Sequence, residues 1–380
     1  MHLVDTTLFY SPTSGGVKRY LTAKHAWLGA HSAWTHSILV PGPQERMERG
    51  GVCTIAGYPV PGTFNYRLPL NVRRWIDLLD ALEPDLIEAG DAFHPAWCAS
   101  AVARRRGIPV AAFYHSNLPQ IIGRRIGSTS ERTLGRYVRW LYQRFDVVFA
   151  PSRLMCGYLR SLGVPHVTHQ PLGVDAEVFH PRQRSMDLRR KLGLPRETRL
   201  LVYAGRFAGE KNLPVLLKAF AQLGPPYHLL LIGGEREARP NGQVTLLPYR
   251  RNPEELAQWL ASADALVHAG TKETFGLVVL EAMACGRPVV AARAGAIPEI
   301  VDQEVGMLAE PTDADSMAQA IAALYERDLD AVGAIARQRI LQRFTWNQAF
   351  QCQISAYMSL LGAKRVRFTA GETATAVAAD

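Results

Sequence analysis

A glycine-marked turn between an apolar run and an expected helix carries two cations. Residues 200–212 read Leu-Leu-Val-Tyr-Ala-Gly-Arg-Phe-Ala-Gly-Glu-Lys-Asn, and a helix is expected from Leu213. Such a turn leaves backbone N–H groups free, and Arg206 and Lys211 add positive charge where the strand ends. This combination favours a diphosphate ligand, although two ordinary surface cations are an alternative interpretation. The spacing from Gly205 is not that of a P-loop, and no Ser or Thr follows the lysine to bind magnesium, so NTP hydrolysis is not indicated.

Two glutamates surround a second expected anion site. Glu273 and Glu281 are eight residues apart, around the expected start of another helix. We expect Thr274 to cap this helix, which exposes the N–H groups of Phe275, Gly276 and Leu277 to an anion. Carboxylates accept hydrogen bonds from vicinal hydroxyls, so the arrangement suits a ligand with central phosphates and polyols at both ends, such as a nucleotide-sugar. The alternatives are a favourable helix-dipole contact for Glu273 and a solvated helix face for Glu281.

The first half of the chain contains weaker candidates. Gly15 and Gly16 open the first expected helix, where a backbone without side chains allows a close approach to a ligand, although a Gly-Gly pair is also an ordinary turn. His115 follows the apolar run 110–114 and should lie at the carboxyl end of a strand, with a structural histidine as the alternative. Asp91 also follows an expected strand, and it could contact a sugar or cap a helix.

The elements that must position these residues alternate regularly. Short aliphatic or β-branched runs are separated by amphipathic stretches of about ten to fifteen residues, which is typical of parallel sheets. The expected strands are 37–40, 86–88, 110–114, 147–150, 167–169, 200–203, 228–232, 244–247, 265–268 and 289–292. The fold class is therefore α/β, with two Rossmann-like, doubly wound domains. Such sheets bind ligands at the carboxyl ends of their strands, so we expect a ligand cleft between the domains.

The amino-acid composition indicates which class of protein the sequence encodes. The 380 residues are 48% apolar and 20% charged, which indicates a folded two-domain protein. Five cysteines without a CxxC pair suggest neither a zinc site nor a disulfide framework, so we expect a reducing cytoplasm. We also expect no export signal and no membrane-spanning helix.

One segment alone carries a net charge of +9, equal to that of the whole chain. Residues 100–165 contain eleven arginines and only two acids, Glu131 and Asp146. Three of these arginines share one expected helix stripe, with an apolar stripe of the same helix beside it. We expect a peripheral contact with an anionic membrane surface, and a solvated basic face is the alternative. The arginines of this stripe are Arg132, Arg136 and Arg139; the apolar residues are Leu134, Val138, Leu141 and Phe145.

Taken together, the motifs resemble the retaining GT-B glycosyltransferases of family 4, which include bacterial lipid and polysaccharide mannosyl-, glucosyl- and galactosyltransferases. The most specific match is the Glu-x7-Glu motif, whose intervening residues include the sequence Phe-Gly-Leu-Val-Val-Leu. One departure is Ala269-Gly270, where the family commonly has Pro-Ser. The other matching segments are Ser14–Val17, Tyr114–Pro119, Ala150–Arg153, Pro171–Asp175, Phe179–Pro181, Gly205–Arg206, Glu210–Asn212, Gly295–Val301 and Arg343–Trp346.

The resemblance implies a domain organisation and a role for each site residue. It implies an acceptor-side domain at 1–175, a donor-binding domain at 176–345, and a C-terminal helix at 346–366 that packs back on the first domain. Separately, the Ala-, Thr- and Gly-rich composition of residues 369–380 predicts a disordered tail. The implied catalytic residues are His115, Arg206, Lys211 and Glu273. The implied donor-binding residues are Gly15, Gly16, Arg206, Lys211, Glu273, Phe275, Gly276, Leu277 and Glu281.

The implied reaction is transfer of a hexose from a nucleotide-diphosphate sugar, GDP-mannose or a UDP-hexose, to a hydroxyl of a lipid or glycan, with retention. Arg206 and Lys211 would offset the charge of the diphosphate leaving group, so no metal and no other cofactor is expected. A nucleotide-sugar epimerase of the same fold and a non-catalytic sugar-nucleotide or glycan-binding protein are the alternatives. Because stacking aromatics, a helix-turn-helix pattern and zinc ligands are missing, we expect no nucleic-acid partner.

Overall fold

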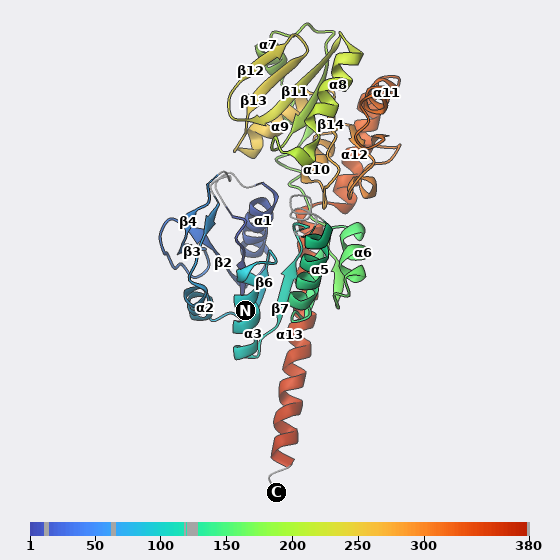
Figure 1. Ribbon diagram of the computed structural model, residues 1–380. Helices are drawn as coiled ribbons and strands as arrows, with labels where there is room; N and C mark the ends of the chain where they lie inside the picture. Colours follow the sequence, from blue (N-terminus) through green and yellow to red (C-terminus); the bar gives the residue numbers. More distant parts are fainter. Residues whose placement is uncertain (11–14, 62–65, 118, 120–127, 378–380) are drawn as a thin grey trace. The chain divides into compact units, whose positions relative to one another are not determined.

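A computed structural model describes residues 1–10, 15–61, 66–117, 119 and 128–377 (Figure 1). The chain divides into two compact units. Unit 1 comprises Met1–Pro171 with Ala349–Asp380, and unit 2 comprises Leu172–Gln348. The sequence placed these limits at 175 and 345. Among the described residues, no helix is both long and apolar enough to cross a membrane.

Unit 1 is built on a sheet whose strands run parallel, in the order β3-β2-β1-β6-β7-β8-β9. The strands are β1 His2–Thr6, β2 Thr35–Gly42, β3 Val52–Ala56, β6 Leu86–Ala89, β7 Val110–Phe113, β8 Val147–Ala150 and β9 Val167–His169; a separate two-stranded sheet pairs β4 Tyr58–Pro59 with β5 Arg67–Leu68. The order reverses beside β1, which is the topological switch point of a doubly wound sheet.

Helices pack on this sheet and bury its apolar side chains. They are α1 Gly16–His31, α2 Val72–Ala81, α3 His94–Arg106, α5 Ser128–Tyr142 and α6 Arg153–Ser161. Trp75, Val102 and Phe145 belong to one buried cluster with the central strands. The core also contains Val138 and Leu141 of α5. The expected apolar stripe of this helix is therefore not available to a membrane, because it packs inward.

Unit 2 repeats the architecture with the strand order β12-β13-β11-β10-β14-β15-β16. The strands are β10 Arg199–Ala204, β11 Tyr227–Gly234, β12 Ala238–Asn241, β13 Val244–Pro248, β14 Ala265–His268, β15 Val289–Ala292 and β16 Gly306–Ala309. Neighbouring strands are parallel except for the antiparallel pair of β12 and β13. Two doubly wound α/β units are thus present, as the sequence predicted.

The helices of unit 2 are α7 Met186–Lys191, α8 Leu213–Leu223, α9 Pro253–Ser262, α10 Leu277–Ala284, α11 Ala314–Leu324 and α12 Leu329–Arg343. α8 and α11 bury Phe220, Met317 and Ile321 in one cluster with β10, β11 and β14. The short α10 is buried along most of its length, and its first turn lies at the carboxyl edge of the sheet, after β14.

The last helix, α13 Trp346–Val377, belongs to unit 1 from Ala349 onward. Its buried residues Phe350, Gln353, Tyr357 and Leu361 recur every three or four positions, so they share one helix face. Residues 369–377, which we expected to be a disordered tail, are helical. Residues 378–380 lie outside the described part of the chain.

Candidate active site

In unit 2, strand pairing brings two distant loops together. β10 and β14 are parallel neighbours, so the loops that follow them leave the sheet at the same edge. The side-chain amide of Asn212 donates to the carbonyl of Ala269 at 3.1 Å, and the N–H of Thr271 donates to the carbonyl of Glu210 at 3.3 Å. These bonds join the loop that carries the two expected cations to the loop that carries Glu273.

Glu273 lies between a cation and a histidine. Lys211 donates from Nζ to Oε1 of Glu273, and His268 Nε2 lies 3.0 Å from the same oxygen. Burial raises the pKa of Glu273, but the charge of Lys211 and the hydrogen bond from His268 outweigh this effect and hold it well below its usual range. Glu273 is therefore a carboxylate at neutral pH, held in place from two sides.

His268 is a further candidate site residue, which the sequence indicated only as the end of a strand. The side chain is 1% exposed, and its Nδ1 accepts the backbone N–H of Gly270 at 3.2 Å. Because Nδ1 is an acceptor, the ring hydrogen of a neutral His268 lies on Nε2, which faces Glu273. A Cβ at position 270 would lie 2.5 Å from Cε1 of His268, so glycine is required for this contact. A strand-terminal histidine followed two residues later by glycine was the available signal.

Arg206 lies on a loop with little steric freedom. Its backbone carbonyl accepts the hydroxyl of Tyr203 at 2.9 Å, and the preceding Gly205 has a φ of +152°. A Cβ on Gly233, at the end of β11, would lie 1.8 Å from the carbonyl oxygen of Gly205. The Arg206 guanidinium is partly exposed and lies 3.6 Å from the carboxylate of Glu210. Both expected diphosphate cations are therefore paired with acids in this structure.

The start of α10 differs from the expectation. Thr274 does not cap the helix: the N-cap is Gly276, with a φ of +102° and no side-chain cap, and the helix begins at Leu277. A Cβ at Gly276 would meet Cδ1 of Ile297 at 2.8 Å, so the chain passes too close for a side chain. The N–H groups of the first turn have no intrahelical acceptor, as at any helix start.

The loop after β15 contacts the backbone of Glu273. Gly295, after β15, has a φ of +59°, and a Cβ there would lie 2.7 Å from the backbone carbonyl oxygen of Glu273. The N–H of Ala296 donates to that carbonyl at 2.9 Å. The Gly295–Val301 segment thus positions the backbone of the first glutamate. Phe275, the next residue but one, is buried and packs edge-on against Phe344.

Glu281 is one of the few buried carboxylates among the residues that the structure describes. It lies in the second turn of α10 and is 2% exposed, so the alternative of a solvated helix face is wrong. Charged side chains are seldom buried without a specific role or partner. The burial supports the expectation that Glu281 acts within a site, and its role with ribose remains a prediction.

In unit 1, the half-buried His115 packs against two aromatic rings. It follows β7, stacks on Phe113 with ring centroids 4.2 Å apart, and meets the ring of Tyr20 edge-on at 4.8 Å. Burial lowers the pKa of His115 to about 3, so the imidazole is neutral at physiological pH. A neutral imidazole can exchange hydrogen bonds with a hydroxyl without placing positive charge beside it.

The remaining candidates of unit 1 lie near the same strand ends. Gly15 is the N-cap of α1, which begins at Gly16, and a Cβ on Gly15 would have no neighbour within 4 Å. Ser14 lies outside the described residues. Asp91 is buried and accepts the hydroxyl of Thr7 at 2.8 Å and the N–H of Leu8 at 2.6 Å. Asp91 therefore anchors the end of β1, which favours a structural role over a contact with sugar.

The candidate site residues thus form two groups, one in each unit. Arg206, Lys211, Glu273 and the start of α10 lie at the carboxyl edge of the sheet of unit 2, and His115 lies at that of unit 1. Contact of both groups with one donor remains a prediction. Within the described ranges, no group of three or more His, Cys, Asp or Glu side chains is arranged to hold a metal ion.

Two family profiles match these two halves. The profile described as Glycosyltransferase Family 4 matches residues 14–178, and the profile described as Glycosyl transferases group 1 matches residues 198–327. The chain belongs to glycosyltransferase family 4. This confirms the enzyme class that the Glu-x7-Glu motif and the glycine-marked turn predicted.

Solved structures support the fold of this glycosyltransferase. Sucrose-phosphate synthase from Thermosynechococcus elongatus superimposes with a TM-score of 0.79 over 95% of this chain and 99% of that chain, at 22% identity. HepE from Anabaena, in complex with UDP-glucose, gives a TM-score of 0.75 over 94% and 99% of the two chains, also at 22% identity. The fold is GT-B, as expected.

Two curated relatives are more similar in sequence. A sulfoquinovosyl transferase from Arabidopsis thaliana is 31% identical over 318 residues, which span 79% of this chain and 62% of the relative. A GDP-mannose-dependent alpha-(1-6)-phosphatidylinositol dimannoside mannosyltransferase from Mycobacterium tuberculosis is 29% identical over 98% of this chain and 99% of its own length. This chain therefore spans less than two thirds of the first relative and nearly all of the second.

Proposed function

We propose that this glycosyltransferase moves a hexose from a nucleotide-diphosphate sugar to a hydroxyl of a lipid or glycan, with retention and without a metal ion. The observation that carries the proposal is the contact of Glu273 with Lys211 and His268, at a sheet edge that also carries Arg206. This edge offers two cations, a carboxylate and a helix start to one ligand. Their charges match a diphosphate next to a sugar with free hydroxyls.

The transition state explains why the cations matter. As the glycosidic bond breaks, the sugar acquires oxocarbenium character and the diphosphate gains negative charge. Arg206 and Lys211, which lie beside Glu210 and Glu273, would stabilise the charge of a diphosphate bound at this edge. His268 then keeps Glu273 in place as an acceptor for sugar hydroxyls. His115 contributes hydrogen bonding without a positive charge that would oppose the oxocarbenium ion.

GDP-mannose is the first donor to test. The relative that spans nearly the same length is GDP-mannose-dependent and, by its name, acts on a phosphatidylinositol dimannoside. We propose the same classes of donor and acceptor for this chain, namely a nucleotide-diphosphate hexose and a lipid-linked glycan. UDP-hexoses are the comparison donors, and no observation favours an epimerase or a non-catalytic role.

Substitution of Lys211 tests the proposed mechanism. Lys211→Ala should lower kcat as well as donor affinity, because the charge of the diphosphate increases toward the transition state. Steady-state kinetics with GDP-mannose, alongside the exposed Lys218→Ala control on the same unit, provides the measurement. A raised KM with an unchanged kcat would contradict transition-state stabilisation. Full turnover after EDTA treatment supports metal independence, whereas activity that is lost and then restored by Mg²⁺ or Mn²⁺ would overturn it.

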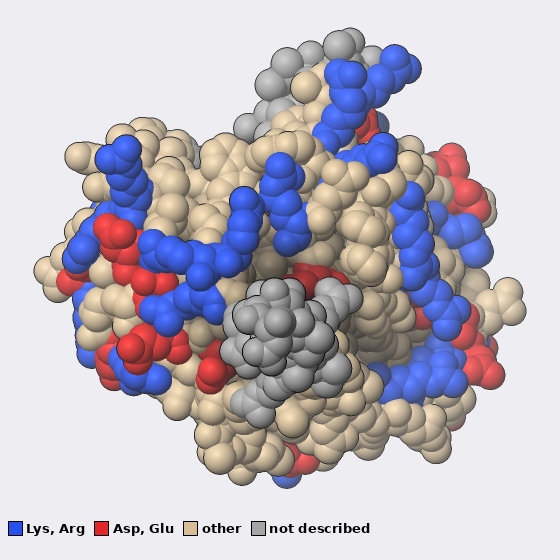
Figure 2. All heavy atoms as spheres, turned by 90° about the horizontal axis from the view of Figure 1, so that it is seen from below, with Lys and Arg blue, Asp and Glu red and all other residues tan. Residues whose placement is uncertain are grey.

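We also propose a cytoplasmic location with peripheral contact at an anionic membrane. The support is the basic face of α5, on which Arg132, Arg136 and Arg139 are exposed. Trp97 and Trp140 add aromatic surface, since they are 44% and 49% exposed and both pack against the ring of Tyr137. Lys and Arg side chains are also spread over the face drawn in Figure 2. Arginines and tryptophans together suit the headgroup region of a bilayer.

A further inference from the structure

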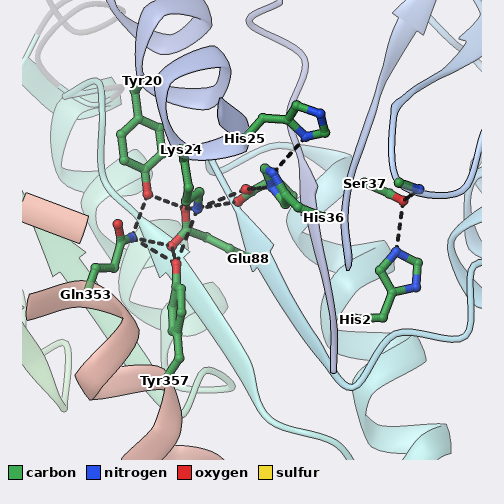
Figure 3. Close-up of polar contacts among 11 residues, drawn as sticks. His2, Tyr20, Lys24, His25, His36, Ser37, Glu88, Gln353 and Tyr357 are labelled. Carbon is green, nitrogen blue, oxygen red and sulfur yellow. Dashed lines mark hydrogen bonds and ion pairs between the residues drawn. The ribbon is translucent and has the colours of Figure 1, made fainter. Parts of the chain in front are cut away.

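Unit 1 contains a buried ion cluster centred on Lys24 of α1. The side chain is 0% exposed, and its Nζ donates to Asp5 at 2.9 Å and to Glu88 at 2.8 Å (Figure 3). Asp5 on β1 and Glu88 on β6 are register partners on adjacent parallel strands. Their carboxylates therefore point to the same face of the sheet, and Lys24 lies over both.

Two helices converge on Glu88. From α1, Tyr20 donates its hydroxyl to Oε1 at 2.8 Å; from α13, Gln353 donates to Oε2 at 2.9 Å and Tyr357 donates to the same oxygen. Gln353 also donates to the hydroxyl of Tyr20 at 2.5 Å, which links the two helices directly. Burial and the nearby carboxylates raise the pKa of both phenols, so they keep their protons and remain donors.

Stability alone does not account for this cluster. Burying three charged groups carries a desolvation cost, and well-packed apolar side chains at such a helix–sheet interface are often equally stabilising. A hydrogen-bonded carboxylate instead specifies where each donor lies, which apolar packing does less strictly. The cluster is therefore suited to holding a neighbouring side chain in one position.

The cluster contacts His115 through the ring of Tyr20. The ring of Tyr20 meets the imidazole edge-on at 4.8 Å, and it also lies 4.9 Å from Phe113, on which the imidazole stacks. On another side, a Cβ at Gly90 would lie 3.7 Å from Cδ2 of His115. Tyr20 therefore has its hydroxyl in the ion cluster and its ring against the histidine.

We propose that Tyr20 is a positioning residue for His115, and that α13 sets this position through the bonds of Gln353 to Tyr20 and Glu88. The proposal rests on the proposed function, in which His115 acts on the donor sugar. A displacement of about 1 Å is sufficient to slow an oriented reaction about a hundredfold. The C-terminal helix thereby contributes to catalysis without contacting the substrate.

Two phenylalanine substitutions separate positioning from stability. Tyr20→Phe and Tyr357→Phe each remove one phenol that donates to Glu88, but only Tyr20 contacts His115. Both should lower the melting temperature by about 4 to 8 °C, because each removes a hydrogen bond to a charged group. Tyr20→Phe should lower kcat about tenfold and Tyr20→Leu about a hundredfold, whereas Tyr357→Phe should leave kcat within about twofold. Equal losses of kcat in the two Phe variants would overturn the proposal.

A double-mutant cycle with His115→Ala tests whether Tyr20 acts through the histidine. If it does, adding Tyr20→Phe or Gln353→Leu to His115→Ala should cause no further loss of kcat. Losses that multiply would show an independent effect and overturn the proposal.

An NMR readout does not depend on activity. The imidazole resonances of His115 should shift more in Tyr20→Phe than in Tyr357→Phe. Equal or absent shifts would contradict positioning even in a protein that transfers no sugar. An unchanged kcat in His115→Ala, with the imidazole shifted by Tyr20→Phe, would instead count against the proposed role of the histidine.

Discussion

Glu281 faces the interior of unit 2, where a carboxylate needs hydrogen-bond donors that outweigh its desolvation. We predict that Glu281→Ala weakens donor binding by about 1.5 to 3 kcal/mol, because charge-assisted hydrogen bonds to a ligand are lost. Isothermal titration with the nucleotide-sugar measures this change, and the exposed Glu326→Ala is the matched control. Wild-type affinity in a folded Glu281→Ala protein would remove Glu281 from the donor site.

Gly270 is predicted to be as sensitive as a catalytic residue, although it has no side chain. Gly270→Ala places a Cβ 2.5 Å from Cε1 of His268, so the imidazole that contacts Glu273 must shift. We expect kcat/KM to fall about ten- to a hundredfold, as a misplaced site residue would cause. Gly242→Ala, where a Cβ meets nothing within 4 Å, is the control. Equal activity of both variants would show that His268 does not position Glu273.

The sequence predicted the candidate site residues that lie in loops with a recognisable local pattern. Lys211 and Glu273 were recognised because each follows a strand within a marked loop. His268 was missed because its importance comes from the contact with Glu273, which depends on how the loop after β14 folds back. The prediction for Thr274 was wrong because the left-handed conformation of Gly276 delays the helix until Leu277.

At the scale of elements, buried parallel strands were recognisable because both of their faces are apolar. The strand β3 was missed, since Val-Cys-Thr-Ile-Ala mixes exposed and buried positions at the sheet margin. Amphipathic periodicity identified α5 but not the use of its apolar face, which packs into the core rather than against a bilayer. The same pattern serves both purposes, and only the position of the helix distinguishes them.

We predict that the ion cluster stabilises the packing of α1 and α13 on the sheet. Lys24→Met should lower the free energy of unfolding by about 3 to 5 kcal/mol, because Asp5 and Glu88 then remain buried without their cation. Urea denaturation followed by circular dichroism gives the value. Lys218→Met, the same change at an exposed position of α8, should have little effect. A small loss for both variants would mean that water or protonation compensates the carboxylates.

For the whole molecule, acid should weaken folding partly through His115. Its folded pKa of about 3 lies below the value near 6.5 of an unfolded chain, so the unfolded state binds the proton more readily. This contribution is fully present above pH of about 6.5 and is lost progressively as the pH falls toward about 3. The stability difference between wild type and His115→Phe, measured by urea titration across this window, should therefore change with pH. A constant difference would indicate a histidine that titrates normally.

The proposed membrane contact would depend on exposed groups of the whole surface, because Val138, Leu141 and Phe145 of the expected apolar stripe are buried. Each arginine near an anionic surface contributes about 1 kcal/mol before salt screening, and tryptophans favour the interface. We predict that the protein sediments with anionic vesicles at about 50 mM salt and dissociates at about 500 mM, where the Debye length is only a few ångströms. Replacing Arg132, Arg136 and Arg139 by Ser, or Trp97 and Trp140 by Ala, should each reduce binding, and neutral vesicles should bind little. If the wild-type protein ignores anionic vesicles at low salt, or the triple Arg variant binds as well as wild type, the basic face is simply solvated and the acceptor reaches the enzyme from solution.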